Sequence, residues 1–336
     1  MRKYFLFLSI LILFSFPNIF GMNNLALTDI SPEDFFGHDI ATIGDVDGDG
    51  ITDMAVGAPY DDDGGESHGA VYILFLNSDG TVKNSQKISS TEGNFQETLD
   101  PYDAFGRAIS SIGDFDDDGI TDIVVGAYHD DDGGYNTGAV YILFLNSDGT
   151  VKNSQKISST EGNFQGIIDS GDCWGNAITS LNDFDGDGIT DIAVGAHKNY
   201  SPGSEMKRVG AVHILLLNSD GTVKSSQEIS DTQGNFDALN ENDIFGIDLV
   251  NLSDINNDGI TDIAVGAHGD SENGFSRGAV YILFLNSDGT VKSYEKINSN
   301  QKNFSDQLDD SDMFGTSLSN IGDINNDGIT DIAVGA

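Results

Sequence analysis

The chain has 336 residues, of which 38% are hydrophobic and 9% aromatic, so it can bury a sizeable core and wholesale disorder is excluded. Its 15 basic and 55 acidic residues give a formal net charge of −40, which argues against nucleic acid or an anionic membrane surface as partner and favours bound cations. The one cysteine, Cys173, excludes an intramolecular disulfide.

The N-terminus has the pattern of a targeting segment. Arg2 and Lys3 precede an apolar run from Tyr4 to Phe16, which Pro17 ends. The run is too short to span a bilayer, which needs about 18 or more apolar residues, and it is typical of a secretory signal. We therefore expect a signal peptide over residues 1–21 and a secreted or cell-surface protein, with an uncleaved anchor as the alternative. After this segment we expect no membrane span.

The rest of the chain is organised around one repeated stretch. Asp45 begins the segment Asp-Val-Asp-Gly-Asp-Gly-Ile-Thr-Asp, and related segments begin at Asp114, Asp183, Asp254 and Asp323, at intervals of 69, 69, 71 and 69 residues. Between the first two, residues 69–96 recur letter for letter as residues 138–165. A period of this size indicates one supersecondary unit stacked on copies of itself, because a single unit cannot bury its own apolar face.

Each unit has the pattern of four short strands. In the first unit, residues 41–44 lead into the Asp-rich segment, residues 53–56 follow it, and residues 70–76 are apolar without a break, as in a strand buried on both faces. A hairpin signal, Asn-Ser-Asp-Gly, then leads to a polar strand whose Lys83 and Lys87 we expect at a solvent-facing edge. Four-stranded antiparallel units in series predict an all-β fold, a β-propeller, and fit a solenoid less well because solenoid rungs are shorter.

The sequence ends at Ala336, two strands into the fifth unit. Residues 22–336 therefore hold four complete repeats and the first half of a fifth. We interpret them as a fragment of a longer propeller. A closed ring of five, to which Asn23 to Ile30 would add one strand, is the alternative.

The Asp-rich segments have the spacing of cation loops. Carboxylates at positions one, three and five point inward, glycine at position six allows the sharp turn, position seven offers its carbonyl, and Asp at position nine closes the site. An EF-hand is excluded, because position twelve is valine inside a strand. The predicted ligands are Asp45, Asp47, Asp49, Ile51 and Asp53; Asp114, Asp116, Asp118, Ile120 and Asp122; Asp183, Asp185, Asp187, Ile189 and Asp191; Asp254, Asn256, Asp258, Ile260 and Asp262; and Asp323, Asn325, Asp327, Ile329 and Asp331.

Hard cations such as Ca²⁺ take about six to eight oxygen ligands, whereas Mg²⁺ keeps several waters. The loops therefore predict about one Ca²⁺ per repeat, with weaker binding in the last two loops, where Asn replaces Asp at position three. Four carboxylates crowded into one hairpin repel one another without metal, so we expect the ions to be structural and the fold to depend on calcium.

The order Phe-Gly, Asp loop, Gly-Ala resembles the FG-GAP repeat of integrin α-subunit β-propellers and of related secreted bacterial proteins. The first repeat carries it as Phe36-Gly37 and Gly57-Ala58-Pro59; Trp174 replaces Phe in the third, and Tyr128, His197 and His268 replace the proline. The resemblance implies a ring that usually has seven blades, which favours the incomplete ring. It also implies Asp loops on one face and ligand contacts on the opposite face. Carried onto this chain, the ligand-facing loops are residues 60–68, 128–137, 197–208 and 268–277, with inter-repeat segments such as 91–103.

Three functions remain open. A calcium-dependent module for adhesion or recognition, binding an unknown protein or glycan opposite the Asp loops, is the leading one. The alternatives are a non-catalytic propeller within a larger secreted enzyme and a structural spacer. The chain has no His-Glu-x-x-His motif, and its clustered carboxylates are assigned to the cation loops, so we expect no catalytic site in it. His129, His197 and His268 are expected to be polar surface residues.

Overall fold

The computed structural model describes residues 30–198, 208–272, 274–300 and 308–336. The expected signal peptide and residues 23–29 lie outside the described residues. Within the described part, one 3₁₀ turn (η1, Pro32–Asp34) accompanies eighteen strands. The all-β fold predicted from the sequence is confirmed.

The strands form successive antiparallel sheets, here called blades 1 to 5. Blades 1 to 4 have four strands each in chain order, and blade 5 has two in the described residues. Blade 1 contains β1 (Ile40–Thr42), β2 (Met54–Ala58), β3 (Ala70–Leu76) and β4 (Val82–Ile88); blade 2 contains β5 (Phe105–Gly113), β6 (Asp122–Ala127), β7 (Ala139–Leu145) and β8 (Val151–Ile157). Blade 3 contains β9 (Trp174–Asn182), β10 (Asp191–Ala196), β11 (Ala211–Leu217) and β12 (Val223–Ile229); blade 4 contains β13 (Phe245–Ser253), β14 (Asp262–Ala267), β15 (Ala279–Leu285) and β16 (Val291–Ile297); blade 5 contains β17 (Ser317–Gly322) and β18 (Asp331–Gly335).

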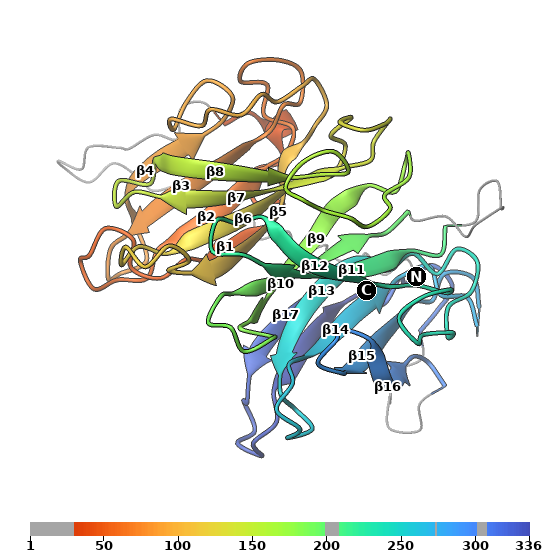
Figure 1. Ribbon diagram of the computed structural model, residues 1–336. Coiled ribbons are helices and arrows are strands. Elements are labelled where there is room, and N and C mark those ends of the chain that lie inside the picture. The colour runs from red at the N-terminus through yellow and green to blue at the C-terminus, as the bar shows by residue number, and fades with distance from the viewer. Residues whose placement is uncertain (1–29, 199–207, 273, 301–307) are drawn as a thin grey trace, which may run out of the picture.

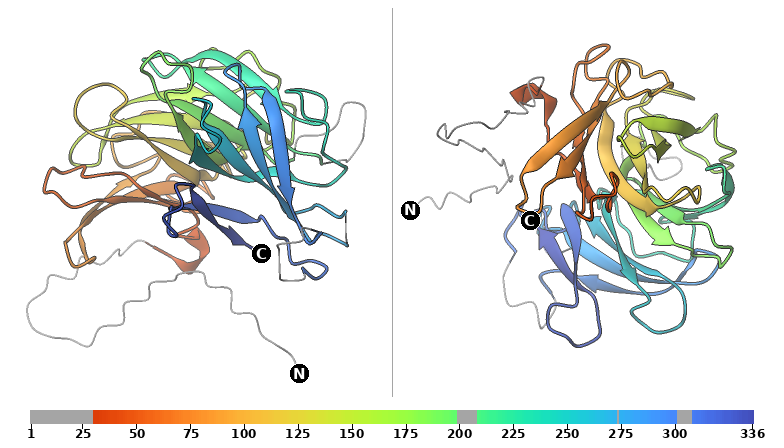
Figure 2. Two further views of the ribbon diagram at one scale, coloured as in Figure 1. Left: turned by 90° about the horizontal axis from the view of Figure 1, so that it is seen from below. Right: turned by 90° about the vertical axis from the view of Figure 1, so that its left-hand side faces the viewer.

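The blades follow one another around a common centre, as in a propeller (Figure 1). The right-hand view of Figure 2 shows this succession from orange through yellow and green to blue. The first strand of each blade lies innermost, and neighbouring first strands contact one another. The centre of the molecule is therefore lined by five equivalent strands.

The hydrophobic core lies between the blades. Strands β3 and β7 are apolar throughout and buried along almost their whole length, as predicted. Ile73 and Phe75 of blade 1 pack in one cluster with Phe105, Ile123 and Leu143 of blade 2, and similar clusters fill the next three interfaces. Because each buried side chain of this size contributes about 1.5–3 kcal/mol, the blades stabilise one another through their faces.

Two glycines of each repeat allow the blades to approach closely near the centre. A Cβ atom on Gly57 would lie 2.0 Å from the carbonyl oxygen of Gly106 in the next blade, and Gly126 stands in the same relation to Gly175. Gly106 also has φ +90°, a conformation that L side chains rarely adopt. The Phe-Gly and Gly-Ala motifs are thus the two halves of one backbone contact between neighbouring blades.

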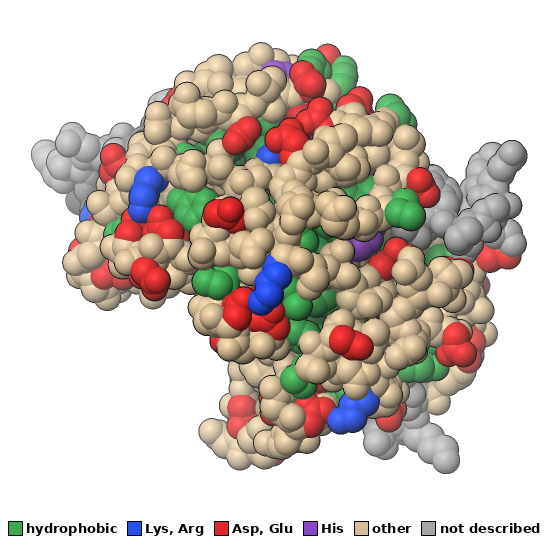
Figure 3. Space-filling model, viewed as in Figure 1, with side chains coloured by type: hydrophobic (Ala, Val, Ile, Leu, Met, Phe, Trp, Pro, Cys, Tyr) green, Lys and Arg blue, Asp and Glu red, His purple; other side chains and the backbone are tan. Residues whose placement is uncertain are grey.

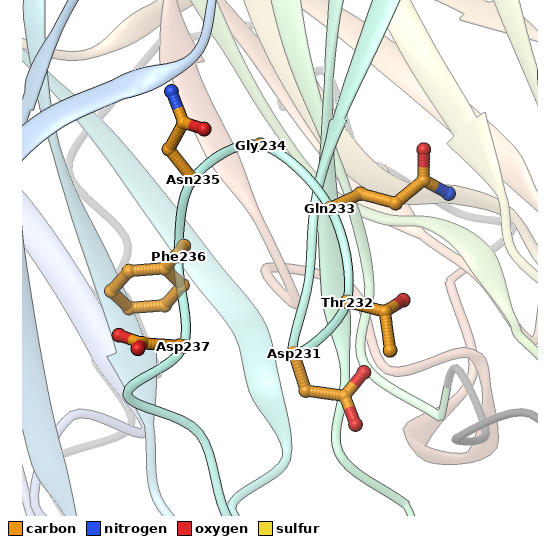
Figure 4. A pocket seen from close by; sticks show the side chains of 7 residues that line it. All are labelled: Asp231, Thr232, Gln233, Gly234, Asn235, Phe236 and Asp237. Atoms are coloured by element: carbon orange, nitrogen blue, oxygen red, sulfur yellow. The ribbon is translucent and has the colours of Figure 1, made fainter.

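Hydrogen bonds join neighbouring blades near the centre and at the periphery. Near the centre, Asp39 Oδ2 accepts from the amide of Ile109 at 2.7 Å, and Asp248 Oδ2 accepts from Leu318 at 2.6 Å. At the periphery, the loop after the fourth strand contacts the next blade: the Gly234 carbonyl accepts from Val291 of β16 at 2.9 Å. Figure 4 shows this loop, residues 231–237, whose polar side chains point away from one another. The shallow hollow beside it therefore offers no convergent set of polar groups, and the loop serves as a connector.

Candidate metal centre

The Asp loops lie together at one end of the blades. Each loop joins the first and second strands of its blade, and in blade 2 the register places Gly113 opposite Asp122 at the loop end and Phe105 opposite Ala127 at the other. The loops that join second and third strands therefore leave from the opposite face. The resemblance to FG-GAP repeats implied this arrangement, with the Asp loops on one face.

Backbone amides organise each loop before any cation is considered. In the first loop, Asp45 Oδ1 accepts from the amide of Asp49 at 2.9 Å and its Oδ2 accepts from Gly50 at 2.7 Å, while Asp49 Oδ1 accepts from Ile51 at 2.9 Å. The second and fourth loops repeat these bonds. Carboxylates at alternate positions thus hold the chain in its curl by accepting from it.

The Asp at position nine is the most buried member of each set. Asp122 is fully buried; its Oδ2 accepts from Phe115 at 3.0 Å and its Oδ1 accepts from Leu145 of β7 at 2.8 Å. Asp53, Asp191 and Asp262 make the corresponding bond to the end of the third strand. This carboxylate ties the loop to the sheet, a role that sequence reasoning missed.

Burial makes the position-nine carboxylates costly to ionise. It raises the pKa of Asp122 to about 7 and those of Asp191 and Asp262 to about 6. Hydrogen bonds from backbone amides oppose this rise but do not cancel it. A divalent cation beside these carboxylates would favour their charged form and remove the cost.

Positions one, three and nine come together in the first three loops. Ligand oxygens of the three residues lie within 4.8 Å of one another in the sets Asp45, Asp47 and Asp53; Asp114, Asp116 and Asp122; and Asp183, Asp185 and Asp191. Asp47 Oδ1 and Asp116 Oδ1 are buried and have no hydrogen-bond partner. Because buried polar oxygens are rarely left unpaired, these two fit a cation ligand, and the residues present can hold a metal ion.

Position five is held from outside by a lysine of the fourth strand. Lys152 Nζ lies 2.6 Å from Asp116 Oδ2 and 2.6 Å from Asp118 Oδ2. Lys83 bridges the same two positions in the first loop and Lys224 in the third, while Lys292 contacts Asp258 in the fourth. The lysine lowers the pKa of Asp118. In Figure 3, several lysine side chains lie against groups of acidic side chains.

Strand β4 lies at the edge of its sheet and Lys83 is exposed, as expected, but the prediction that Lys87 faces solvent was wrong. Lys83 belongs to the Asp loop, and Lys87 is buried, with its Nζ 2.9 Å from Asp61 Oδ2. The strand is polar because its lysines neutralise acids at both ends of the blade. The available signal was a lysine 38 residues after the first Asp of loops one, two and four and 41 residues after that of loop three.

The loops with Asn at position three differ in their contacts. Asn256 Nδ2 donates to Asp262 Oδ2 at 3.1 Å, and Asn325 Nδ2 lies 3.4 Å from Asp331 Oδ1. The amide thus provides a donor where the first three loops have a carboxylate. The metal ligands of all five loops, including the carbonyls of Ile51, Ile120, Ile189, Ile260 and Ile329, stay predictions.

On the opposite face, blades 1, 2 and 4 each have an ion cluster of their own, in which a lysine of the fourth strand pairs with a buried aspartate. In blade 2, Lys156 Nζ lies 2.8 Å from Asp130 Oδ2 and 5.4 Å from the Tyr141 ring centroid, and the Tyr141 hydroxyl donates to Asp130 at 2.9 Å. In blade 3 the Tyr and Lys positions are taken by His213 and Glu228, whose Nε2 and Oε2 atoms are 3.9 Å apart. His197 is buried, so its expected place among surface residues was wrong.

Comparisons with known proteins agree with this architecture. The model described as "FG-GAP repeat" matches residues 36–74 and 105–143, and that described as "FG-GAP-like repeat" matches residues 183–265. Mouse integrin alpha-2 is 35% identical over 166 residues, 48% of this chain and 13% of the integrin; human integrin alpha-6 is 34% identical over 163 residues, 48% of this chain and 12% of the integrin. The matched region is thus a small part of these relatives.

A solved structure of rhamnogalacturonan lyase YesW aligns with 87% of this chain and 54% of its own, with a TM-score of 0.41 and 13% identity. Among the residues that the structure describes, no helix has the length and apolar character needed to cross a bilayer. The repeats matched by sequence are the blades with Phe-Gly, Asp-loop and Gly-Ala contacts described above. The chain therefore contains FG-GAP repeats over residues 36–74 and 105–143 and an FG-GAP-like repeat over residues 183–265, and it is similar over about half its length to integrin α-subunits.

Proposed function

We propose that this chain is a calcium-binding β-propeller that serves as an adhesion or recognition module, secreted or displayed at the cell surface. The observation that carries the calcium assignment is the pair of buried, unpartnered oxygens, Asp47 Oδ1 and Asp116 Oδ1, each within a set of three carboxylates. All-oxygen ligands favour Ca²⁺ over transition metals. The recognition role is supported by the similarity to integrin α-subunits.

The proposed organisation is a signal peptide over residues 1–21 and a propeller over residues 22–336. About one Ca²⁺ per repeat would clamp the loop between the first and second strands. The ligand, a protein or a glycan, would contact the face opposite the Asp loops, where the loops differ most between blades. Within the described residues, the clustered carboxylates are engaged by loop amides and lysines, which favours a binding role over a catalytic one. A non-catalytic part of a secreted enzyme and a spacer are the other candidates.

Calcium removal tests the assignment. A site filled at about a hundredfold over its Kd adds roughly 2.7 kcal/mol to stability. With several sites, a chelator should lower the Tm of the purified chain by about 10 °C or more in thermal denaturation. A shift below about 2 °C, or equal rescue by Mg²⁺, would contradict calcium clamping.

Two substitutions locate the ions. Asp47→Ala removes the carboxylate with the unpartnered oxygen and should lower calcium stoichiometry by one in calorimetric titration. Asp79→Ala removes an exposed acid in the nearby hairpin turn, whose carboxylate accepts from Thr81 at 3.0 Å, and should leave the stoichiometry unchanged. An unchanged stoichiometry in Asp47→Ala would refute this ligand set.

A further inference from the structure

The innermost strands surround a polar cavity on the propeller axis. Its volume is about 630 Å³, and it is lined by residues in or next to the first strands of all five blades together with His268. In β5, β9 and β13 they are the third to sixth of nine residues, in the middle of the strand and not at its Asp-loop end. The volume lies within the range of about 300–1,000 Å³ that is usual for small-molecule sites.

Arg107 is a cation in this cavity whose guanidinium makes no ion pair within 4.0 Å among the residues that the structure describes. Eight other described lysine and arginine side chains lie within 4.0 Å of a carboxylate, but the Arg107 guanidinium does not. Its Nε donates to Asn176 Oδ1 at 2.9 Å, its Nη1 lies against His38 Nε2, and its Cζ is 4.9 Å from the Tyr128 ring centroid. Neutral groups thus make the direct contacts to the guanidinium, while Asp39 and Asp248 interact with its charge from beyond 4.0 Å.

The surrounding imidazoles are neutral at physiological pH. Burial and Arg107 lower the pKa of His38 to about 4, and burial lowers the pKa of His268. His268 Nδ1 lies 3.4 Å from Thr316 Oγ1. Neutral imidazoles, hydroxyls and amides offer both donors and acceptors to a polar ligand.

Two carboxylates also line the cavity, and they restrict which anions fit. Asp39 accepts from the amides of Ile40 and Ile109, and Asp248 accepts from Leu249 and Leu318. Each carboxylate oxygen retains a lone pair that can accept a hydroxyl proton. Burial raises the pKa of both carboxyl groups, that of Asp248 to about 7. In their ionised form they repel a bare anion but bind the hydroxyl groups of a ligand that also carries one carboxylate, because a hydroxyl donated to a carboxylate makes a strong hydrogen bond.

We propose that the axial cavity binds an acidic saccharide, with the sugar carboxylate on the Arg107 guanidinium and ring hydroxyls on Asp39, Asp248 and Asn176. This inference rests on the proposed recognition function and names its ligand class. Arginine suits a carboxylate because its planar fork binds both oxygens. A sugar is favoured over an acidic side chain of a protein because the site is a deep cavity with many hydroxyl, amide and imidazole groups, which one side chain would leave unfilled.

Titration of the full chain in excess calcium with D-glucuronate and D-glucose tests the proposal, since the two sugars differ in the carboxylate. Followed by NMR, glucuronate should shift the signals of cavity residues and bind at least tenfold more tightly than glucose, while acetate should not bind. Arg107→Gln should abolish the preference for glucuronate. Arg277→Gln, which removes a guanidinium paired with Asp310, is the matched control and should keep it.

Equal affinity for the two sugars, or an unchanged preference in folded Arg107→Gln, would overturn the proposal. Binding of a polyglutamate peptide without binding of glucuronate would overturn the saccharide assignment in favour of an acidic protein. The Tm of each variant in calcium shows that it is folded. Failure of the calcium assignment is seen separately, as chelator-insensitive stability, and does not bear on whether glucuronate binds.

Discussion

The two faces of the propeller follow different rules. On the face with the Asp loops, the same carboxylates accept from the same backbone amides in blades 1, 2 and 4, and a lysine from the fourth strand reaches the loop in each of blades 1 to 4. On the opposite face, equivalent positions carry different chemistry. The first position after the Phe-Gly or Trp-Gly pair is His38, Arg107, Asn176, Ile247 or Thr316.

This difference separates what holds the ring together from what distinguishes one blade from another. If the Asp loops bind calcium as proposed, they need the same oxygen ligands each time, so repetition there would preserve the fold. The opposite face carries no such requirement, and its variation falls around the axial cavity. Blades 2 and 3 show the contrast most sharply, because blade 2 has the Tyr141–Asp130–Lys156 cluster and blade 3 has His213 and Glu228 in its place.

The largest effect should come from two lysines of one strand that serve different faces. Lys156 has 7% of its side chain exposed and pairs with buried Asp130, whereas Lys152 is 39% exposed and pairs with the Asp loop. Lys156→Met leaves Asp130 buried without its counter-charge and should lower the free energy of unfolding by about 3 kcal/mol. Lys152→Met should leave urea unfolding in calcium almost unchanged. Similar losses in both variants would remove the distinction between the faces.

The strands and turns of each blade could be predicted from the sequence, but the contacts between residues far apart in the chain could not. The unbroken apolar run of residues 70–76 and the Asn-Ser-Asp-Gly turn follow local rules, so the third strand and its hairpin were predictable. The pairing of Lys152 with Asp116 joins residues 36 positions apart and depends on strand register. The contact between Gly57 and Gly106 depends on how blades pack, so the sequence pattern shows both glycines without revealing that they meet.

His213 should make blade 3 sensitive to acid. Burial lowers its pKa to about 4, below the value of about 6.5 in an unfolded chain. The unfolded state therefore binds the proton first, and the stability linked to neutral His213 is present above pH 6.5 and is lost as the pH falls toward 4. His213→Phe removes the titrating imidazole. The free energy of unfolding of the variant relative to wild type should therefore be about 2 kcal/mol higher at pH 5 than at pH 8.

Urea unfolding of wild type and His213→Phe at the two pH values measures this effect, in excess calcium. Tyr141→Phe is the matched variant in blade 2. It removes the hydroxyl that donates to Asp130, and because burial raises the pKa of that hydroxyl well above 10, the loss should be the same at pH 5 and pH 8. Parallel pH profiles for wild type and His213→Phe would contradict the burial of a neutral imidazole.

The smallest effect concerns position three, the one predicted ligand position at which the Asp loops differ. In blade 4, Asn256 Nδ2 donates to Asp262, and Lys292 contacts only Asp258. Asn256→Asp restores the carboxylate of blades 1 to 3 and should tighten calcium binding at this loop several-fold, because a charged oxygen replaces an amide. Asp116→Asn should weaken the second loop by a similar factor.

Competition with a chromophoric chelator measures both changes, with Asn153→Asp, an exposed site in β8, as the control for added negative charge. If Asn153→Asp tightened binding as much as Asn256→Asp, general attraction by a highly acidic protein would account for the result. If only the loop substitutions change affinity, and in opposite directions, then position three sets the strength of each site. The identity of that residue would then make one face a graded set of calcium clamps while the other face remains free to vary.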